Sequence, residues 1–507
     1  MLGKWIKKIS SLLGTAPRKP DDSGISAETP APKPVATTTR EPVPASIPRQ
    51  AIPRKASPPP APKGRTVSRQ IIIGLDFGTA YTKIIVRDAN DPSAAYLVLH
   101  DLPGELPWLL PSVVYDNNGE LYTALDKVPE NSRRIDYLKM RLVAAVDKKR
   151  AKAWAGHQSA HSIQVVVGWY LARVLAVTEN YLKKEIWPDY GQHSNDCCHV
   201  NIGVPIAYEK DSPVEAKLLA ALYAAYTAAI QDGVKAPSPD TIASLLGKPA
   251  RLKNVRDYCH SYPETSAILQ SYIKSSGRRT GIYLLLDVGA GTVDLSFFRL
   301  WWTKNSNVLE YYFHSDVLDF GSSLMELLMC QFDNTLALED ARRYKENPSQ
   351  PCANSAALKK ALNAAREKIY EEVMVGVGEG LKVTEPKLHP DRRRQLAIMK
   401  ELRIFFSGGG FVDNPYRRSV YSFQQARKWE QLAPIERIPY PNDIDWKRIG
   451  GREHFHRLAV AYGLSFPQWE LGGVENSGVI VPSGTKPPDV PPPKPRERPV
   501  APTKDEV

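Results

Sequence analysis

One sequence design occurs twice in this 507-residue chain, beginning at Ile71 and again at Gly281, 210 positions later. Each copy is an apolar run, a short turn that contains glycine and a carboxylate, and a second apolar run. The pattern predicts a β-hairpin over 71–86 and another over 281–298. Two similar hairpins this far apart indicate two related lobes, each offering its turn to a shared cleft.

The residues of the two turns suit phosphate binding. Glycine lets the backbone approach a phosphate closely, turn amides can donate to its oxygens, and a carboxylate can hold Mg²⁺ through water. The first turn has Gly78, Thr79, Ala80 and Tyr81 after Asp76, and the second has Gly289, Ala290, Gly291 and Thr292 after Asp287. Taken alone, each turn could also have only a structural role, because glycine near aspartate is common in tight hairpin turns.

A third element, over 402–410, is an apolar run that ends in Gly408, Gly409 and Gly410. It predicts a strand, followed by a helix at about 415–428. Three residues without side chains would let a flat ring or a ribose lie against the backbone.

The net charge of +12 and the 43 prolines are distributed unevenly along the chain. Residues 1–70 hold 13 Lys or Arg against 4 Asp or Glu, and half of the prolines fall within 17–62 and 482–502. Both terminal segments lack the apolar residues needed to offset ordering entropy, which predicts disordered or polyproline-like tails. The remaining body is too large for one hydrophobic core, so two lobes are expected.

The first residues form a candidate anchor. On a helical wheel, residues 2–13 place Leu2, Trp5, Ile6, Ile9, Leu12 and Leu13 on one face and the lysines and serines opposite. Such a basic helix suits the surface of an anionic membrane, or it could dock on a partner or on the protein's own body. Nucleic acid is not an expected partner, because Trp5 is the only aromatic residue in the basic segment 1–70 that could stack on bases.

Cysteine and hydropathy patterns predict a cytoplasmic protein, and membrane binding by the anchor helix would make it peripheral on the inner face of the cytoplasmic membrane. The five cysteines lack a repeated spacing, which argues against a disulfide framework. Cys197, Cys198 and His199 have no second ligand pair nearby, so a zinc site is not expected. No apolar run reaches the length of a membrane span, and no signal peptide is evident.

The three glycine-containing elements, in this order, resemble the phosphate-1, phosphate-2 and adenosine motifs of the ATPase superfamily of actin, sugar kinases and heat-shock chaperones. Within it, the chain looks most similar to the seventy-kilodalton heat-shock chaperones. The resemblance covers about 70–465 and extends through the segments 111–115, 137–142, 200–208, 263–267 and 458–464. These motifs occur in register, which makes the match specific.

The resemblance implies a two-lobed, actin-like α/β ATPase with duplicated ribonuclease-H-like lobes, whose mixed five-stranded sheets are flanked by helices. The implied division is an amphipathic helix at 1–14, a linker at 15–68, lobe I at 69–275, lobe II at 276–470 and a Pro-rich tail at 471–507. A helix at about 452–465 is expected to return to lobe I.

The same resemblance implies that ATP binds between the lobes, with Mg²⁺ near Asp76 and Asp287 and the phosphates on the two turns. Lys139 matches the phosphate-contacting lysine of the chaperones. Arg141 is the alternative match, and Lys139 could instead lie on a solvated helix face without contacting phosphate. Glu264, together with Asp287, is implied to position the attacking water, although a helix cap or a surface carboxylate would also place an acid there. Lys83 is expected to point along a strand.

The adenine side departs from the chaperone pattern. Of the chaperones' clamp residues, only Arg366 has a clean match, and it is implied to stack on the base. The chaperones carry a Gly-Gly-x-Asp-Phe-Asp run, and the corresponding residues here, 320–326, differ from it. The inserts near 231–260 and 421–450 have no counterpart in the chaperones. Base selectivity is therefore less defined by the sequence than phosphate binding.

Three functions compete at this point. The first is a chaperone-like ATPase switch of low turnover that acts on a protein partner, without a dedicated substrate-binding domain, since only about forty residues follow Gly463. The second is a membrane-associated bacterial actin-like filament protein that self-assembles. A small-molecule kinase ranks third, because no segment resembles a sugar pocket.

Overall fold

The computed structural model describes 68–102, 106–146, 159–205, 212–302, 308–346, 355–388, 391, 395, 399, 401–412, 414–426, 433–449, 451–471 and 473–476. The chain divides into two units, Met1–Val67 and Ser68–Val507, and all described residues belong to the second. The predicted anchor helix at 2–13, the linker and most of the predicted tail lie outside the described residues.

The first sheet contains six strands. Its main path runs in the order β3-β2-β1-β8-β9, and β4 pairs with β2. The strands are β1 (Gln70–Phe77), β2 (Tyr81–Asp88), β3 (Asp91–Leu97), β4 (Leu110–Pro111), β8 (Cys197–Val204) and β9 (Cys259–Pro263). Strands β1, β2 and β3 form an antiparallel meander, whereas β8 and β9 add in parallel on the other side of β1.

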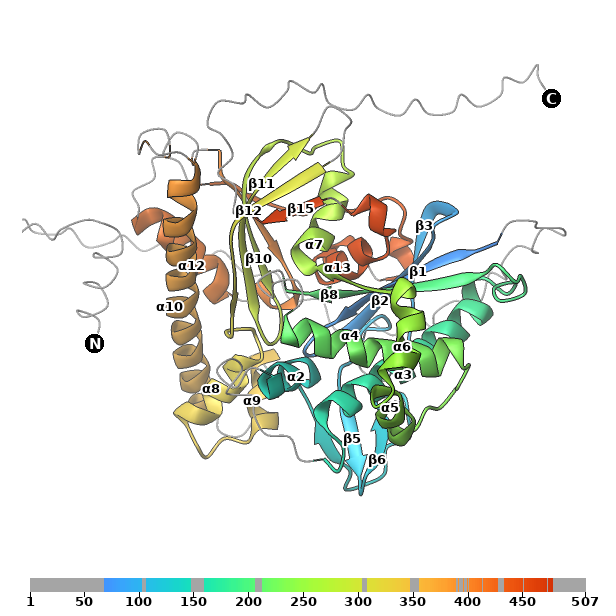
Figure 1. Ribbon diagram of the computed structural model, residues 1–507. Helices are drawn as coiled ribbons and strands as arrows, with labels where there is room; N and C mark the ends of the chain where they lie inside the picture. Colours follow the sequence, from blue (N-terminus) through green and yellow to red (C-terminus); the bar gives the residue numbers. More distant parts are fainter. Residues whose placement is uncertain are drawn as a thin grey trace, which may run out of the picture. The chain divides into compact units, whose positions relative to one another are not determined.

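The second sheet repeats this arrangement (Figure 1). Its six strands run in the order β14-β13-β10-β11-β12-β15. They are β10 (Gly281–Val288), β11 (Val293–Trp302), β12 (Val308–Leu318), β13 (Arg403–Ser407), β14 (Ile435–Glu436) and β15 (Gly473–Asn476). Again the first three form an antiparallel meander, and β13 and β14 add in parallel beside β10.

A small third sheet and a set of helices complete the described fold. The third sheet has the order β6-β5-β7, with β5 (Val114–Asn117), β6 (Glu120–Thr123) and β7 (Arg133–Ile135). The α-helices are α2 (Leu138–Val146), α3 (Ile163–Tyr181), α4 (Pro213–Tyr226), α5 (Pro239–Leu246), α6 (Pro249–Leu252), α7 (Glu264–Ile273), α8 (Leu324–Phe332), α9 (Leu338–Glu346), α10 (Ser355–Leu388), α12 (Asn414–Ala426) and α13 (Phe455–Leu464). The described fold is therefore mixed α/β, with mixed sheets flanked by helices.

Alternation along β1 and β2 assigns the two faces of the first sheet. Ile71, Ile73 and Leu75 belong to one apolar cluster with residues of α3 and α4, such as Val166 and Leu222. These helices begin with serine caps, at Ser162 and Ser212, whose side chains accept bonds from backbone amides of the first turn. The caps start both helices where their apolar faces can cover this side of the sheet.

Helices α7 and α13 lie between the two sheets (Figure 1). A second apolar cluster joins Ile85 of β2, Ile268 of α7, Leu458 of α13 and Leu285 of β10. The side-chain amide of Asn201 on β8 also donates to the carbonyls of residues 464 and 466, at 2.8 and 3.0 Å. The two helices therefore fix how the first sheet stands relative to the second.

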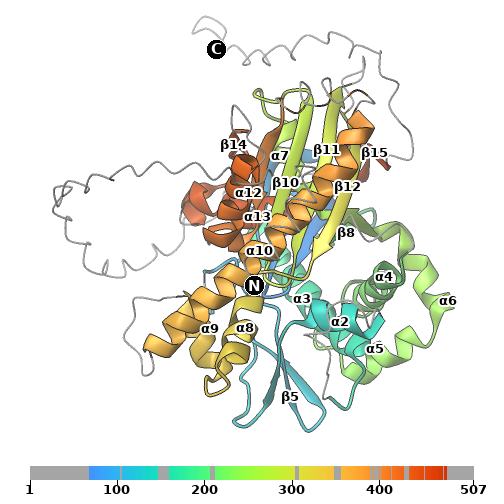
Figure 2. The same ribbon diagram turned by 90° about the vertical axis from the view of Figure 1, so that its left-hand side faces the viewer.

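The outer face of the second sheet is covered by α10 and α12, which lie side by side in Figures 1 and 2. Leu284, Phe297 and Ile404 of the sheet face Leu381 of α10 and Val420 of α12 around a small apolar cavity. Each of the two large sheets is consequently enclosed between helices on both faces, which suits their largely apolar strands.

The sequence predicted several of these elements correctly. Both hairpins form, the strand before the glycine run is β13, and the helix expected at about 415–428 is described as α12 up to Ala426. The expected helix at 452–465 is α13, which contacts both sheets. Within the described residues, no helix is long and apolar enough to cross a membrane.

Two expectations need correction. Each large sheet has six strands and not five, because β4 pairs with the start of β2 and β15 pairs with β12. Strand β15 also lies inside 471–507, which was expected to be a disordered tail. Its residues Gly473–Asn476 precede the proline-rich part of that segment, so they keep the amides that a parallel edge pairing requires.

The crossing of α7 and α13 predicts a large effect of one methyl group. A Cβ at Gly463 would lie 1.9 Å from the carbonyl oxygen of Ala267, so Gly463→Ala must push the helices apart. We expect the free energy of unfolding to fall by about 2–4 kcal/mol in chemical denaturation. Gly277→Ala is the control, since a Cβ there meets no heavy atom closer than 3.9 Å. Equal stabilities of the two variants would contradict the tight crossing.

Candidate functional site

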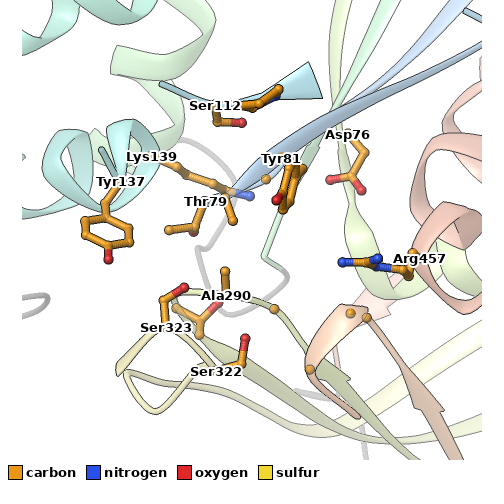
Figure 3. A pocket seen from close by; sticks show the side chains of 18 of the residues that line it. Asp76, Thr79, Tyr81, Ser112, Tyr137, Lys139, Ala290, Ser322, Ser323 and Arg457 are labelled. Carbon is orange, nitrogen blue, oxygen red and sulfur yellow. The ribbon is translucent and has the colours of Figure 1, made fainter. Parts of the chain in front are cut away.

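The turns of the two hairpins meet at a cavity of about 500 Å³ (Figure 3). The backbone amide of Gly289 donates to the carbonyl of Thr292 at 2.9 Å, which closes the second turn. The amides of Ser322 and Ser323 donate to the carbonyls of Gly289 and Ala290, at 3.0 and 2.7 Å. The segment before α8 therefore braces the second turn from behind.

The two turns come into close contact at Gly291. A Cβ at this position would lie 2.7 Å from Oγ1 of Thr79 in the first turn and 2.6 Å from Cγ of Met140 on α2. Gly291 is thus required by the approach of the turns to each other, and it does not line the cavity, unlike Gly289, Ala290 and Thr292.

The glycine run after β13 forms another wall of the cavity. Gly408 has a φ of +83°, a region that favours glycine, and a Cβ there would lie 2.3 Å from the carbonyl oxygen of Val288. Its amide donates to the carbonyl of His456 on α13 at 2.9 Å. Gly408, Gly409 and Gly410 all line the cavity, so β13, β10 and α13 together position this wall.

Three buried acids gather at the inner end of the cavity. Ligand oxygens of Glu264, Asp287 and Asp294 all lie within 4.8 Å of one another. Oδ1 of Asp287 and Oδ1 of Asp294 are buried and have no hydrogen-bond partner in the described protein. Clustered carboxylate oxygens with unsatisfied lone pairs are a donor set that a hard divalent cation such as Mg²⁺ prefers.

The burial of these acids disfavours their charged forms. Desolvation, together with the nearby carboxylates of Glu264 and Asp76, raises the pKa of Asp287 to about 7. Burial and the same Glu264 raise the pKa of Asp294 well above its usual range, and Asp294 hydrogen-bonds with Glu264. Burial also raises the pKa of Asp76, against the opposing effect of Lys83.

Two lysines enter the cluster from the side of the first sheet. Lys139 of α2 donates to Oε1 of Glu264 at 2.6 Å, and Lys83 of β2 donates to Oδ2 of Asp76 at 2.6 Å. Burial would lower the pKa of Lys139, but the carboxylates of Glu264 and Asp76 outweigh it and raise the pKa. The ammonium group of Lys139 therefore stays charged beside the cavity.

Local sequence explains where these side chains lie. In each hairpin the acid before the turn faces the residue seven positions later on the returning strand, Asp76 opposite Lys83 and Asp287 opposite Asp294. Glu264 is the first residue of α7, directly after β9, so the end of that parallel strand delivers it to the cavity. The inverted order Pro263-Glu264 is compatible with this position, because proline ends the strand and the helix begins at the acid.

Most of the predicted residues come together at this cavity. The lining includes Asp76, Gly78, Thr79, Ala80, Tyr81, Lys139, Glu264, Asp287, Gly289, Ala290, Thr292, Gly408, Gly409 and Gly410. Arg366 lies on α10 and is not among the lining residues, so the structure does not bring it to the cavity. Arg141 also points elsewhere, since its Nε donates to the carbonyl of Asp136 at 2.7 Å.

Sequence reasoning missed several lining residues. Lys83 was expected to point along its strand, yet its ammonium reaches Asp76, and the hairpin register could have revealed this pair. Asp294 could have been found in the same way. Other residues come from α8, α9, α13 and the segment before α8, and no local sequence pattern predicts that these approach the cavity; they are Ser322, Ser323, Glu326, Arg342, Lys345, His456 and Arg457.

Comparison with known proteins gives no independent assignment of this site. No model of a known protein family matches the chain, and no curated protein matches it.

The pKa of Asp287 predicts a pH-dependent stability in metal-free buffer. The unfolded chain loses this proton near the ordinary value of 3.8, whereas the folded protein keeps it until about pH 7. The folded state therefore binds the extra proton between these values, and the free energy of unfolding falls as pH rises through them. Asp287→Asn should remove this contribution and be more stable than wild type by about 2–4 kcal/mol near pH 8, with little difference near pH 4.

Denaturant titrations across this pH range check the prediction. Asp91→Asn is the control for loss of one negative charge, because Asp91 is exposed. A constant difference between Asp287→Asn and wild type at every pH would contradict the raised pKa.

Proposed function

We propose that this protein binds ATP with Mg²⁺ and hydrolyses it slowly, as a chaperone-like nucleotide switch on a two-lobed, actin-like fold. One observation carries the proposal. Two sheets with the same strand order each send a glycine-containing turn and a buried aspartate into one cavity. In this proposal the lobes are the two large sheets with their helices, and each would be a ribonuclease-H-like unit; the matching strand orders of the two sheets support it.

The cavity offers complementary groups for a polyphosphate. The amides of the two turns are hydrogen-bond donors, and Lys139 and Lys83 supply positive charge at the same end. The glycine wall of 408–410 leaves room for a flat ring or a ribose beside it. A volume of about 500 Å³ lies in the range of pockets for ligands of nucleotide size.

The acids fit a magnesium ion. Asp76, Asp287 and Asp294 would hold it, directly or through water, and the buried unpartnered oxygens of Asp287 and Asp294 would gain a partner. When bound, Mg²⁺ neutralises charge that develops on the phosphates during transfer. Relief of the repulsion among the acids would stabilise the folded protein as well.

The remaining side chains suit activation of water. Hydrolysis forms a bond from the water oxygen to the terminal phosphorus, breaks the bond from that phosphorus to the bridging oxygen, and releases ADP and inorganic phosphate. Glu264, ion-paired with Lys139, would accept the water proton. Lys139 would stabilise negative charge on the transferring group.

The output of the switch is proposed to be a protein partner. Groups from both sheets line the cavity, so ligand binding would favour one arrangement of the sheets and release would favour another. Adenine selectivity would depend on the wall of 408–410 and on α8 and α9, since Arg366 lies off the cavity.

Matched variants test the proposal. We expect Mg²⁺-dependent ATP binding in calorimetry and slow phosphate release, with Glu264→Gln and Lys139→Ala lowering the rate by about 10²–10³-fold. The exposed pair Lys274–Glu470 has the same donor–acceptor distance of 2.6 Å. Lys274→Ala and Glu470→Gln are therefore controls that should leave the rate unchanged. Absence of ATP binding by the wild-type protein, or equal rates in all variants, would overturn the proposal.

A further inference from the structure

A polar cluster around Tyr137 lines the cavity, and Figure 3 shows Tyr137 on the side of the cavity away from Arg457. Its hub is Glu326 of α8, which is only 2 % exposed. Oε2 of Glu326 accepts from the hydroxyl of Tyr137 at 3.2 Å and from Nε of Arg342 at 3.0 Å, and Oε1 accepts from Lys345 at 2.5 Å. We call these four residues the Glu326 clasp.

The clasp connects the two halves of the site. Tyr137 lies between β7 and α2, one residue before the helix that carries Lys139. Glu326, Arg342 and Lys345 lie on α8 and α9, which follow the segment that braces the second turn. Arg342 strengthens the bridge, since its Nη2 donates to the hydroxyl of Tyr137 at 3.0 Å and lies 3.9 Å from a carboxylate oxygen of Asp136.

The backbone and the core hold Tyr137 in this position. Its φ is +61°, an uncommon conformation for a residue other than glycine, so surrounding contacts must maintain it. Its ring belongs to a small apolar cluster with Met140 of α2 and Leu324 of α8. Burial and the adjacent Glu326 raise the pKa of its hydroxyl, which therefore remains a hydrogen-bond donor.

In the ligand-free protein, the opposite charges of Glu326 and its two cationic partners favour the closed clasp. Glu326 meets two cations and a hydroxyl, so opening the bridge would leave a buried carboxylate with fewer partners. These groups are satisfied within the protein, unlike the unpartnered oxygens of Asp287 and Asp294 at the inner end. The clasp is therefore suited to holding the two sides of the cavity together, whereas the inner acids are suited to binding a ligand.

We propose that the Glu326 clasp is a gate that limits how fast nucleotide enters and leaves the cavity. The inference rests on the proposed function for the identity of the ligand, but the opening of the clasp can be measured without one. It predicts that weakening the clasp speeds association and dissociation together, because a gate raises the barrier in both directions.

Tyr137→Phe tests the opening in ligand-free protein. The substitution keeps the ring in its apolar cluster and removes only the hydroxyl. We expect amide hydrogen exchange to accelerate about three- to tenfold in α2 and α8, the factor for one hydrogen bond. Tyr226→Phe is the matched control: its buried hydroxyl donates at 2.7 Å to the carbonyl of Cys198, away from the cavity. Unchanged exchange in α2 and α8 would overturn the clasp, whatever the protein binds.

Stopped-flow fluorescence with N-methylanthraniloyl-ATP tests the gate. In Tyr137→Phe we expect the association and dissociation rate constants to rise by similar factors of about three to ten, so that the dissociation constant changes little. Faster dissociation alone would make Tyr137 a ligand contact and overturn the gate, and unchanged rates would overturn it as well.

Glu326→Gln is a second variant of the same bridge, and thermal unfolding checks that it folds. It should raise both rate constants further, because it weakens the bonds to Tyr137, Arg342 and Lys345 together. In the double variant with Tyr137→Phe, the fold-increase of each rate constant should be smaller than the product of the two single fold-increases, since both substitutions act on one bridge. Effects of the two substitutions that multiply in the double variant would show that the two residues do not share a gate. If the wild-type protein does not bind the nucleotide but hydrogen exchange accelerates in Tyr137→Phe, the proposed function and the gate both fail, and the clasp is only a structural bridge.

Discussion

The crossing of α13 over α7 is the contact on which the geometry of the site depends. Gly463 and Ala267 meet there without room for a side chain, and the two helices contact both large sheets. The turns after β1 and β10 touch at Thr79 and Gly291 only because the sheets stand at this separation. A change of a few tenths of an ångström between the helices would reach the cavity, because packed interiors transmit strain.

The cavity carries an electrostatic cost that the fold only partly offsets. Asp76, Glu264, Asp287 and Asp294 are buried within one site, and two lysines pair with only two of them. Desolvation and mutual repulsion favour protonation of Asp287 and Asp294, as their raised pKa values indicate. Sites of this kind are less stable than an apolar core would be, which is typical of positions that have a function.

Local patterns predicted the parts of this site that lie within one hairpin or one turn. Gly78, Gly408 and Asp287 each belong to a short pattern of adjacent residues, so the sequence alone indicated them, although the close neighbour of Gly408 is Val288 on another strand. The side chains of Arg342 and Lys345 reach the cavity through the packing of α8 and α9, which no local periodicity encodes. Arg366 was misplaced for the same reason, since its motif match did not determine which face of α10 meets the cavity.

Strand β15 has a consequence for solubility. It covers part of the edge of β12, pairing with it from Leu309 to Tyr312. An uncovered edge strand presents unpaired amides and carbonyls that can pair with another chain. Residues 473–476 therefore protect this part of β12 from pairing with another chain. A chain that ended after α13 would keep every residue that lines the cavity but would leave this edge of β12 unpaired and prone to aggregation.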